Sequence, residues 1–358
     1  MDVHDLTVAD VVDRTTTAFR RTDATATVHD LRRLEGGVSS LTYAAVVSGE
    51  HGDQPIVVKF APPGLAPVRN RDVLRQATML DRLADLDGFP VPRVLARDDG
   101  APPSEPPMFA MELRPGDAYE PMLDVADQPP SAEDVCRRQH GAARALATLH
   151  SRSPESLGVD ESPIPVEEEL ERWARLFSTV DPDIAVGHER LYERLAARVP
   201  AGAPPVVVHG DYRASNMLFR GPDLEAVIDW EIWSVGDPRV DLVWLLIHTD
   251  PAHTFFDPRG PADLEAGRLM PSADELFDTY LRTRRELGAT DVDLEPVQRD
   301  LDWFRGWANY KVASTVSVIH KRDRKRAVPD SKIATAAARI GEVLAAGHLA
   351  LDCRTVSH

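Results

Sequence analysis

The feature that most constrains this chain is the alternation of apolar and polar segments between His209 and Leu246. An apolar run ends in HGDYRASN, where four residues separate Asp211 from Asn216. Two short apolar runs around a Gly-Pro-Asp turn follow, and a second carboxylate, Asp229, comes thirteen residues after Asn216. Apolar runs bounded by turn residues are typical of strands. We therefore predict a strand, a polar loop and a hairpin that together present Asp211, Asn216 and Asp229.

This order of carboxylate, amide and carboxylate suits phosphoryl transfer. One carboxylate orients the hydroxyl that receives the phosphoryl group, while an amide oxygen and a second carboxylate hold Mg²⁺ against the phosphates. Asp211 is the candidate catalytic residue, and Asn216 and Asp229 are the candidate metal ligands. Taken singly, each also fits a structural role, because Asp and Asn are common in turns. Taken together, with the strand before them and the hairpin between them, they favour the catalytic interpretation.

A glycine- and serine-rich turn near the N-terminus is a candidate phosphate-binding loop. Gly36, Gly37, Ser39 and Ser40 lie between two predicted strands. Glycine allows a backbone to approach phosphate closely, and N–H groups and hydroxyls bind phosphate oxygens. Such a turn by itself is a weak signal, because it also occurs as an ordinary connection between strands.

Lys59 lies in the next predicted strand, IVVKF. Alternation along a strand places Val57 and Lys59 on one face, opposite Ile56, Val58 and Phe60. A lysine on a strand is commonly a solvated edge residue. A glycine-rich turn precedes Lys59, and the segment from His209 to Leu246, called the HGD segment below, follows it. We therefore predict that Lys59 contacts nucleotide phosphates.

Hydrophobic periodicity divides the chain into a β-rich part and a helical part. Residues 1–113 carry a helix near 5–21, several strands and one further helix at 70–86. Residues 114–358 are mostly helical apart from the HGD segment. The helices expected there are 131–149, 167–177, 188–198, 273–287, 294–322 and 331–351. Within them, Trp303, Trp307 and Tyr310 recur at helical spacing, and we expect core packing rather than a wall of the acceptor pocket.

Composition excludes several classes of protein. Lys and Arg number 41 against 58 Asp and Glu, and a net charge of −17 disfavours nucleic acid as a partner. The two cysteines, Cys136 and Cys353, form neither a disulfide scaffold nor a zinc cluster, which fits a reducing compartment. The N-terminus lacks a signal-peptide pattern and no apolar run is long enough to span a bilayer. We expect a cytoplasmic protein without a membrane partner, and the oligomeric state stays open.

The string HGDYRASN…VIDWE…GDPRVDL resembles the aminoglycoside phosphotransferase and choline kinase-like family. The resemblance covers roughly residues 30 to 320, and the DWE and GDP motifs are similar to the kinase-like domain of some acyl-CoA dehydrogenases. It implies an α+β, bilobal, protein-kinase-like fold. Residues 1–113 would form a nucleotide-binding N-lobe. Residues 114–358 would form a C-lobe with the catalytic loop, the metal loop and the acceptor-binding helices.

The same resemblance implies roles for individual residues. Asp211 would be the catalytic base, Asn216 and Asp229 would bind Mg²⁺, and Lys59 would contact the phosphates of ATP. Backbone groups at Met111 and Leu113 would form the hinge that binds adenine.

One departure from the family concerns the partner of the strand lysine. Gln76 stands where a helix glutamate is expected to pair with Lys59. Glutamine can hydrogen-bond a lysine but supplies no charge, and Asp72, one helical turn earlier, is an alternative partner. The resemblance also gives Asp241 a structural role, bracing the catalytic loop from an almost wholly apolar helix.

These observations together favour an ATP- and Mg²⁺-dependent kinase that acts on a hydroxyl of a small molecule. Only seven residues separate Asp229 from Asp237, which leaves no room for a protein-kinase activation loop. The net negative charge favours an aminoglycoside-like acceptor, whereas the DWE and GDP motifs and the basic run 320–326 favour a hydroxyacyl-CoA-like one. The alternative from another class is a nucleotide-binding pseudo-kinase regulator without turnover, which Gln76 supports.

Overall fold

The computed structural model describes residues 6–34, 40–250, 253 and 260–353. The chain divides into two compact units. Unit 1 contains Met1–Asp117, Met217–Arg220 and Glu225–Trp233, and unit 2 contains Ala118–Asn216, Gly221–Leu224 and Ser234–His358. The return of the chain to unit 1 after residue 216 gives this unit the segment that carries Asp229.

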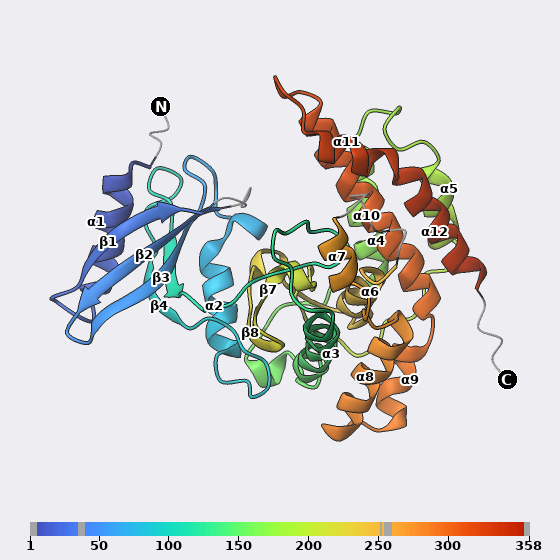
Figure 1. Ribbon diagram of the computed structural model, residues 1–358, viewed down its shortest axis with the longest axis horizontal. Helices are drawn as coiled ribbons and strands as arrows, with labels where there is room; N and C mark the ends of the chain where they lie inside the picture. The colour runs from blue at the N-terminus through green and yellow to red at the C-terminus, as the bar shows by residue number, and fades with distance from the viewer. Residues whose placement is uncertain (1–5, 35–39, 251–252, 254–259, 354–358) are drawn as a thin grey trace. The chain divides into compact units, whose positions relative to one another are not determined.

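Unit 1 is built on a five-stranded antiparallel sheet (Figure 1). The strands are β1 (Thr27–Arg33), β2 (Leu41–Gly49), β3 (Gly52–Phe60), β4 (Val94–Asp98) and β5 (Met108–Glu112), in the order β1-β2-β3-β5-β4. Helix α1 (Val8–Phe19) packs its apolar stripe, including Val11 and Phe19, on one face of this sheet. The α+β class expected from the sequence is confirmed.

Strand β3 alternates as predicted. Ile56, Val58 and Phe60 are fully buried in the core beneath α1, while Val57 and Lys59 face the other side of the sheet. On β5, Phe109 lies opposite Lys59 and Met111 lies opposite Val57. The strand register therefore sets which β5 side chains surround the lysine.

Helix α2 (Val73–Leu83) begins later than the predicted 70–86 because Asp72 caps it. The Asp72 backbone is not helical, and its carboxylate accepts the N–H of Arg75 at 3.0 Å. Residues Arg69–Arg71 form a separate 3₁₀ turn. Strands β7 (Met217–Arg220) and β8 (Asp223–Val227) form the predicted hairpin, which leads to Asp229 and the 3₁₀ turn Trp230–Ile232.

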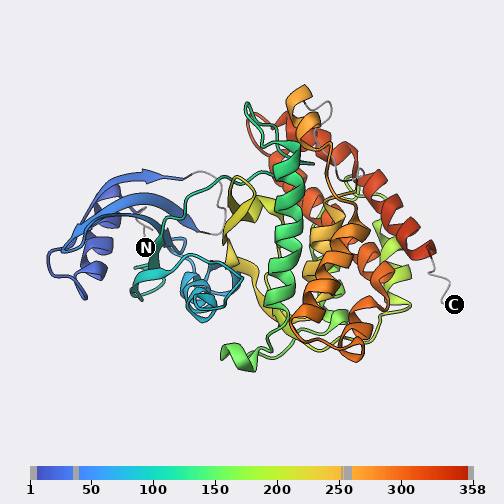
Figure 2. The same ribbon diagram turned by 60° about the horizontal axis from the view of Figure 1, so that its bottom comes forward.

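Unit 2 is mostly helical. Strands β6 (Val206–Val208) and β9 (Ser234–Gly236) pair antiparallel. The helices are α3 (Ala132–Leu149), α4 (Val166–Phe177), α5 (His188–Ala196), α6 (Arg239–Ile247), α7 (Pro261–Ala266), α8 (Ala273–Glu286), α9 (Asp291–Gln298), α10 (Leu301–Asp323), α11 (Ser331–Ala338) and α12 (Ile340–Asp352). Helix α3 runs beside α8, and α10 runs beside α12 (Figure 2).

Two segments of this unit were predicted as single helices, and this prediction was wrong because each of them forms two helices. The segment 294–322 breaks between α9 and α10, where Arg299 is extended and Asp300 is left-handed. At this break the carbonyl of Arg299 accepts a hydrogen bond from Arg239 at 2.7 Å. The segment 331–351 likewise breaks into α11 and α12 at Arg339.

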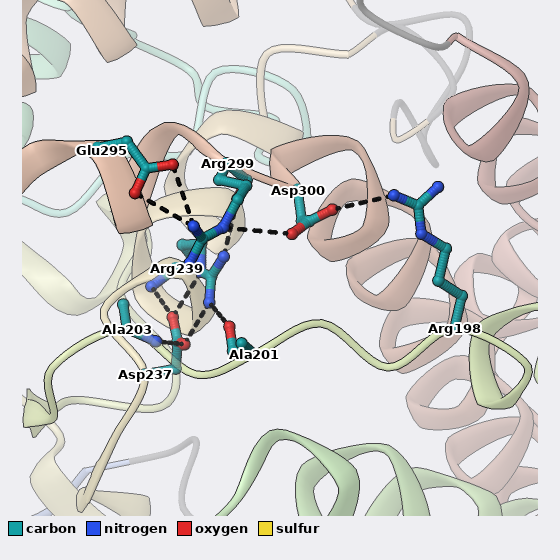
Figure 3. Close-up of polar contacts among 8 residues, drawn as sticks. All are labelled: Arg198, Ala201, Ala203, Asp237, Arg239, Glu295, Arg299 and Asp300. Atoms are coloured by element: carbon teal, nitrogen blue, oxygen red, sulfur yellow. Dashed lines mark hydrogen bonds and ion pairs between the residues drawn. The ribbon is translucent and has the colours of Figure 1, made fainter.

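Arg239 forms a buried ion pair with Asp237 at the start of α6 (Figure 3). The pair is fully surrounded, since Arg239 also donates to the carbonyl of Ala201 and the N–H of Ala203 donates to Asp237. A buried charge pair is tolerated when its remaining donors and acceptors are satisfied in this way. The network ties the 201–203 segment, the α9–α10 junction and the start of α6 together.

Helix α10 passes through the core of unit 2. Trp303, Trp307 and Tyr310 are all buried, so the expectation of core packing is confirmed. In the part of the chain that the structure describes, neither α10 nor another helix is long and apolar enough to cross a membrane.

Candidate active site

The loop that follows β6 is held by a buried carboxylate on α6. The backbone N–H groups of His209 and Gly210 donate to Asp241 at 2.5 and 2.8 Å. Asp241 is fully buried, which raises the pKa of its carboxyl, while the nearby His209 and both N–H bonds oppose this rise. Its predicted role in bracing the loop is confirmed.

The same loop gives Asp211 its orientation. Gly210 has a φ of +88°, a left-handed conformation that glycine adopts without strain. The N–H of Asp211 then donates to Nδ1 of His209 at 3.2 Å. His209 thus contacts the backbone of the residue that it precedes by two positions.

Three side chains of unit 2 hold the Asp211 carboxylate. Trp244 Nε1 donates to Oδ1 at 2.7 Å, and Asn216 Nδ2 donates to Oδ2 at 2.8 Å. The guanidinium of Arg213 lies 3.4 Å from Oδ1. Asn216 also donates to the backbone carbonyl of Asp211, so the predicted catalytic residue and the predicted metal ligand lie together.

These contacts keep Asp211 ionised. Desolvation raises the pKa of its carboxyl, but the charges of Arg213 and Lys311 and the Trp244 hydrogen bond outweigh it and lower the pKa to about 2. A carboxylate with so low a pKa is a weak proton acceptor at neutral pH. The geometry therefore suits Asp211 to orienting a hydroxyl more than to removing its proton.

Lys311 is a member of the site that the sequence analysis missed. Its ammonium group donates to the carbonyl of Gly210 at 2.6 Å and lies 3.6 Å from the centre of the Trp244 ring. Trp173 and Trp307 flank it at 5.2 and 5.5 Å. The available signal was a lysine within an otherwise apolar stretch of a buried helix, where a charge requires a reason.

Glu120 was also missed, and it supports the far end of the loop. It is buried, and its Oε2 accepts the N–H of Ser215 at 3.4 Å, next to Asn216. Burial raises the pKa of Glu120 to about 7, although the charge of Arg213 opposes the rise. The chain approaches Glu120 through an irregular segment, so no periodic pattern marked it.

In unit 1, Lys59 pairs with Asp229. Lys59 Nζ lies 3.1 Å from Asp229 Oδ1, with the lysine buried and the Asp229 side chain 41% exposed. Asp229 has a left-handed backbone with a φ of 65°, at the residue before the Trp230–Ile232 turn. The structure thus brings together a predicted phosphate contact and a predicted metal ligand.

Neither expected substitute for the missing glutamate contacts Lys59 among the described residues. Gln76 donates instead to the carbonyl of Asn70 at 3.4 Å, and Asp72 is occupied as the cap of α2. The hypothesis that Asp72 replaces the glutamate was therefore wrong. Asp229 is the carboxylate that holds Lys59.

The remaining predicted nucleotide contacts differ in how far the structure describes them. Gly36, Gly37 and Ser39 lie outside the described residues, while Ser40 is buried just before β2. The N–H of Leu113 already donates to the carbonyl of Pro55 at 3.1 Å. It would have to exchange this bond in order to bind a base.

Met111 lines a cavity of about 10 Å³ in unit 1 together with Lys59, Gln76 and Asp229. A space of this size holds about one water molecule. An adenine ring does not fit it, so a base at this position would require the surrounding side chains to move.

The candidate metal ligands offer oxygen atoms. Because Asn216 uses its amide nitrogen for Asp211, its amide oxygen is the atom left for a cation, and Asp229 is half exposed. The described residues hold no cluster of three or more His, Cys, Asp or Glu side chains suited to a metal. Mg²⁺ is commonly bound by one or two protein oxygens with water and phosphate completing its shell, so these residues fit it.

Comparison with known proteins decides the family. The model of the phosphotransferase enzyme family matches residues 30–276, which include Lys59 and the whole HGD segment. The chain belongs to this family. The family is one of phosphotransferase enzymes, which is the class that the sequence predicts.

Two curated relatives illustrate the range of the family. Mouse acyl-CoA dehydrogenase family member 10 is 24% identical over 301 residues, which cover 82% of this chain and 26% of that protein. Viomycin phosphotransferase from Streptomyces vinaceus is 30% identical over 178 residues, covering 47% of this chain and 59% of that protein. The chain thus spans about a quarter of the first relative and little more than half of the second.

Solved structures of phosphotransferases share the fold of this chain. A structure from Ralstonia eutropha, described as an aminoglycoside phosphotransferase, is 18% identical, with a TM-score of 0.72 over 95% of this chain and 98% of that one. Aminoglycoside phosphotransferase APH(4)-Ia, in a complex with AMP-PNP and hygromycin B, is 14% identical, with a TM-score of 0.58 over 93% and 98%. The expected kinase-like fold is confirmed.

Proposed function

We propose that this family member transfers the γ-phosphoryl group of ATP to a hydroxyl group of a small molecule, with Mg²⁺ as the metal. The observation that carries the proposal is the Asp211 carboxylate, which has three side-chain partners, Trp244, Asn216 and Arg213. An ordinary turn aspartate has no need of three side-chain partners. In phosphoryl transfer, such positioning together with charge stabilisation supplies most of the catalysis.

Each predicted residue has a role in this proposal. Asp211 accepts the hydrogen bond of the acceptor hydroxyl and directs its oxygen towards the phosphorus. Lys59 binds phosphate oxygens, with Asp229 beside it. Asn216 and Asp229 would hold Mg²⁺, which supplies neutralisation of the charge on the phosphates when it is bound.

The N-lobe contacts of the nucleotide complete the proposal. Backbone and hydroxyl groups at Gly36, Gly37, Ser39 and Ser40 bind the triphosphate, and Met111 and Leu113 bind the base. The complex of APH(4)-Ia with AMP-PNP supports the use of a nucleotide by this fold.

The acceptor is aminoglycoside-like or hydroxyacyl-CoA-like, and each choice has support. The complex of aminoglycoside phosphotransferase APH(4)-Ia with hygromycin B supports the first choice, and the names of the acyl-CoA dehydrogenase relatives support the second. The basic run adds less to the second choice than the sequence indicates. Lys321 donates to the carbonyl of Thr179, Arg324 pairs with Asp183, and Arg326 pairs with Asp323.

A regulator without turnover is the second candidate, because Lys59 lacks the helix glutamate of the family. Its partner Asp229 would have to serve both the lysine and the metal. The intact hydrogen bonding of Asp211 and Asn216 weighs against this candidate, since a site without catalysis has no need to keep that arrangement.

A mass-spectrometric screen tests the proposal. The protein is incubated with ATP, Mg²⁺ and either aminoglycosides or hydroxyacyl-CoAs, beside D211N and a matched control, D223N, at an exposed position on β8. We expect one acceptor to gain one phosphoryl group with the wild-type chain and D223N, and turnover to fall about 10³-fold with D211N. Equal product from D211N would contradict the role of Asp211. Binding of ATP without any product would favour the regulator.

A further inference from the structure

We propose that Trp244 and Lys311 form a positioning pair that sets the orientation of Asp211, and that Lys311 acts in its charged form. This inference rests on the proposed function, in which Asp211 orients the acceptor hydroxyl. Both residues belong to unit 2, on α6 and α10, and nothing in the motif around Asp211 indicates them.

The pair contacts Asp211 and the residue before it. Trp244 reaches the carboxylate directly, with Nε1 donating to Oδ1 at 2.7 Å. Lys311 reaches the backbone just before it, with Nζ donating to the carbonyl of Gly210 at 2.6 Å. One contact therefore fixes the rotation of the side chain, and the other fixes the peptide from which that side chain projects.

The two members of the pair also act on each other. The Lys311 ammonium lies 3.6 Å from the centre of the Trp244 ring, within the range of a cation–π interaction. A cation over the face of an indole draws electron density from the ring, which makes its N–H a stronger donor. The charge of Lys311 is thereby transmitted to the hydrogen bond that Trp244 donates to Asp211.

Burial of Lys311 indicates that its charge has a use. The residue is 3% exposed, and a buried ammonium is costly unless carboxylates and hydrogen bonds compensate it. The charged groups that act on it are Asp211 and Asp241, together with Glu169 and Arg172 of α4. A methionine would fill the same space between the tryptophans at no electrostatic cost.

The charge state of Lys311 links the pair to pH. Burial lowers the pKa of Lys311 to about 8, although Asp211, Asp241 and Glu169 oppose the fall. Turnover should therefore decline above pH 8 as the cation over Trp244 is lost. Stability should change in the opposite direction. The unfolded chain holds this proton up to its ordinary pKa near 10.5, so the native state gains stability as pH rises from about 8 to 10.5.

The first experiment follows the indole N–H resonance of Trp244 by NMR in the full ¹⁵N-labelled chain, assigned with W244F, from pH 6 to 10. We expect the resonance to titrate with a midpoint near pH 8 and to stop titrating in K311M. A resonance that does not move overturns the proposal. A midpoint near pH 7 that persists in K311M but disappears in E120Q would assign the titration to Glu120 and also overturn it.

The second experiment compares turnover with MgATP and the acceptor found by the screen. W244F should lower kcat about 10- to 100-fold with little change in the KM values. The matched control W303F should stay within about twofold. Trp303 is buried like Trp244, but its indole donates to the carbonyl of Leu195 at 3.0 Å and not to Asp211. Equal losses in W244F and W303F would show that general packing causes the effect, which contradicts positioning.

Lysine variants separate charge from packing. K311M should lower kcat and remove the decline of kcat above pH 8, whereas K311R should recover part of kcat and keep its activity at high pH, because arginine stays charged. If K311M fails to fold, the wild-type titration and W244F still decide the question. If the protein has no kinase activity, none of the variants turns over, yet the NMR titration still confirms or contradicts the contact.

Discussion

The carboxylates of Asp211 and Asp229 are similarly exposed, at 31% and 41%, but they are held very differently. Asp211 has Trp244, Asn216 and Arg213 around it. In the described part of the chain, Asp229 has a single side-chain partner, Lys59. Exposure by itself does not distinguish these two residues, whereas the number of side-chain partners does.

The difference indicates that the Asp211 carboxylate is already oriented before a substrate binds, whereas the Asp229 carboxylate keeps more freedom. A carboxylate with both oxygens already bonded loses little freedom when a substrate arrives, which is the condition for positioning. A carboxylate with one oxygen bonded keeps the other available for a cation or water. Asp211, in the loop after β6, is therefore the more constrained carboxylate. Asp229, in the segment after β8, is the less constrained one.

The largest effect that would sharpen this comparison concerns the metal. D229N should lower turnover about 10³-fold and raise the Mg²⁺ concentration needed for half-maximal rate, because an amide binds a cation less well than a carboxylate. D211N should lower turnover to a similar extent without changing the Mg²⁺ requirement. Titration of Mg²⁺ at saturating ATP measures both, and a shift in D211N with none in D229N would reverse the two assignments.

A smaller effect concerns the stability of the loop that carries Asp211. D241N should lower the free energy of unfolding by about 3 kcal/mol, because two buried N–H groups share this one acceptor and each unsatisfied group costs about 1–3 kcal/mol. Urea unfolding, monitored by tryptophan fluorescence, measures the change, with D223N as the exposed control. A loss no larger than that of the control would show that Asp241 does not brace the loop.

The smallest effect concerns the surroundings of the Lys59–Asp229 pair. Q76E places a carboxylate in the cavity that Gln76 shares with Lys59, where it supplies the charge that the family pattern provides. We expect the affinity for ATP to rise about threefold, the scale of a single added ion pair. Isothermal titration calorimetry measures the affinity. The matched control is Q139E, because Gln139 is also buried but lies in unit 2. A weaker affinity in Q76E would mean that the new carboxylate competes with Asp229 for Lys59.

Local patterns predicted much of the structure because they depend on neighbouring residues. The alternation that buries Ile56, Val58 and Phe60 follows from the geometry of a strand. The role of Asp241 was predictable too, because a carboxylate within an apolar helix must find partners. The hydrogen bond at the break near Arg299 was not predictable, because its donor, Arg239, lies 60 residues earlier.

The sequence by itself determined the fold class, the family and the order of the chemical groups, from Lys59 through Asp211 and Asn216 to Asp229. These depend on residue types at short spacings, which persist in the linear chain. Only the tertiary structure decided that Trp244 contacts Asp211, that Lys311 contacts the carbonyl of Gly210, and that Asp229 rather than Gln76 or Asp72 contacts Lys59. The reason is physical, since a hydrogen bond between residues 33 or 101 positions apart leaves no spacing in the sequence, and burial and direction appear only after the helices pack.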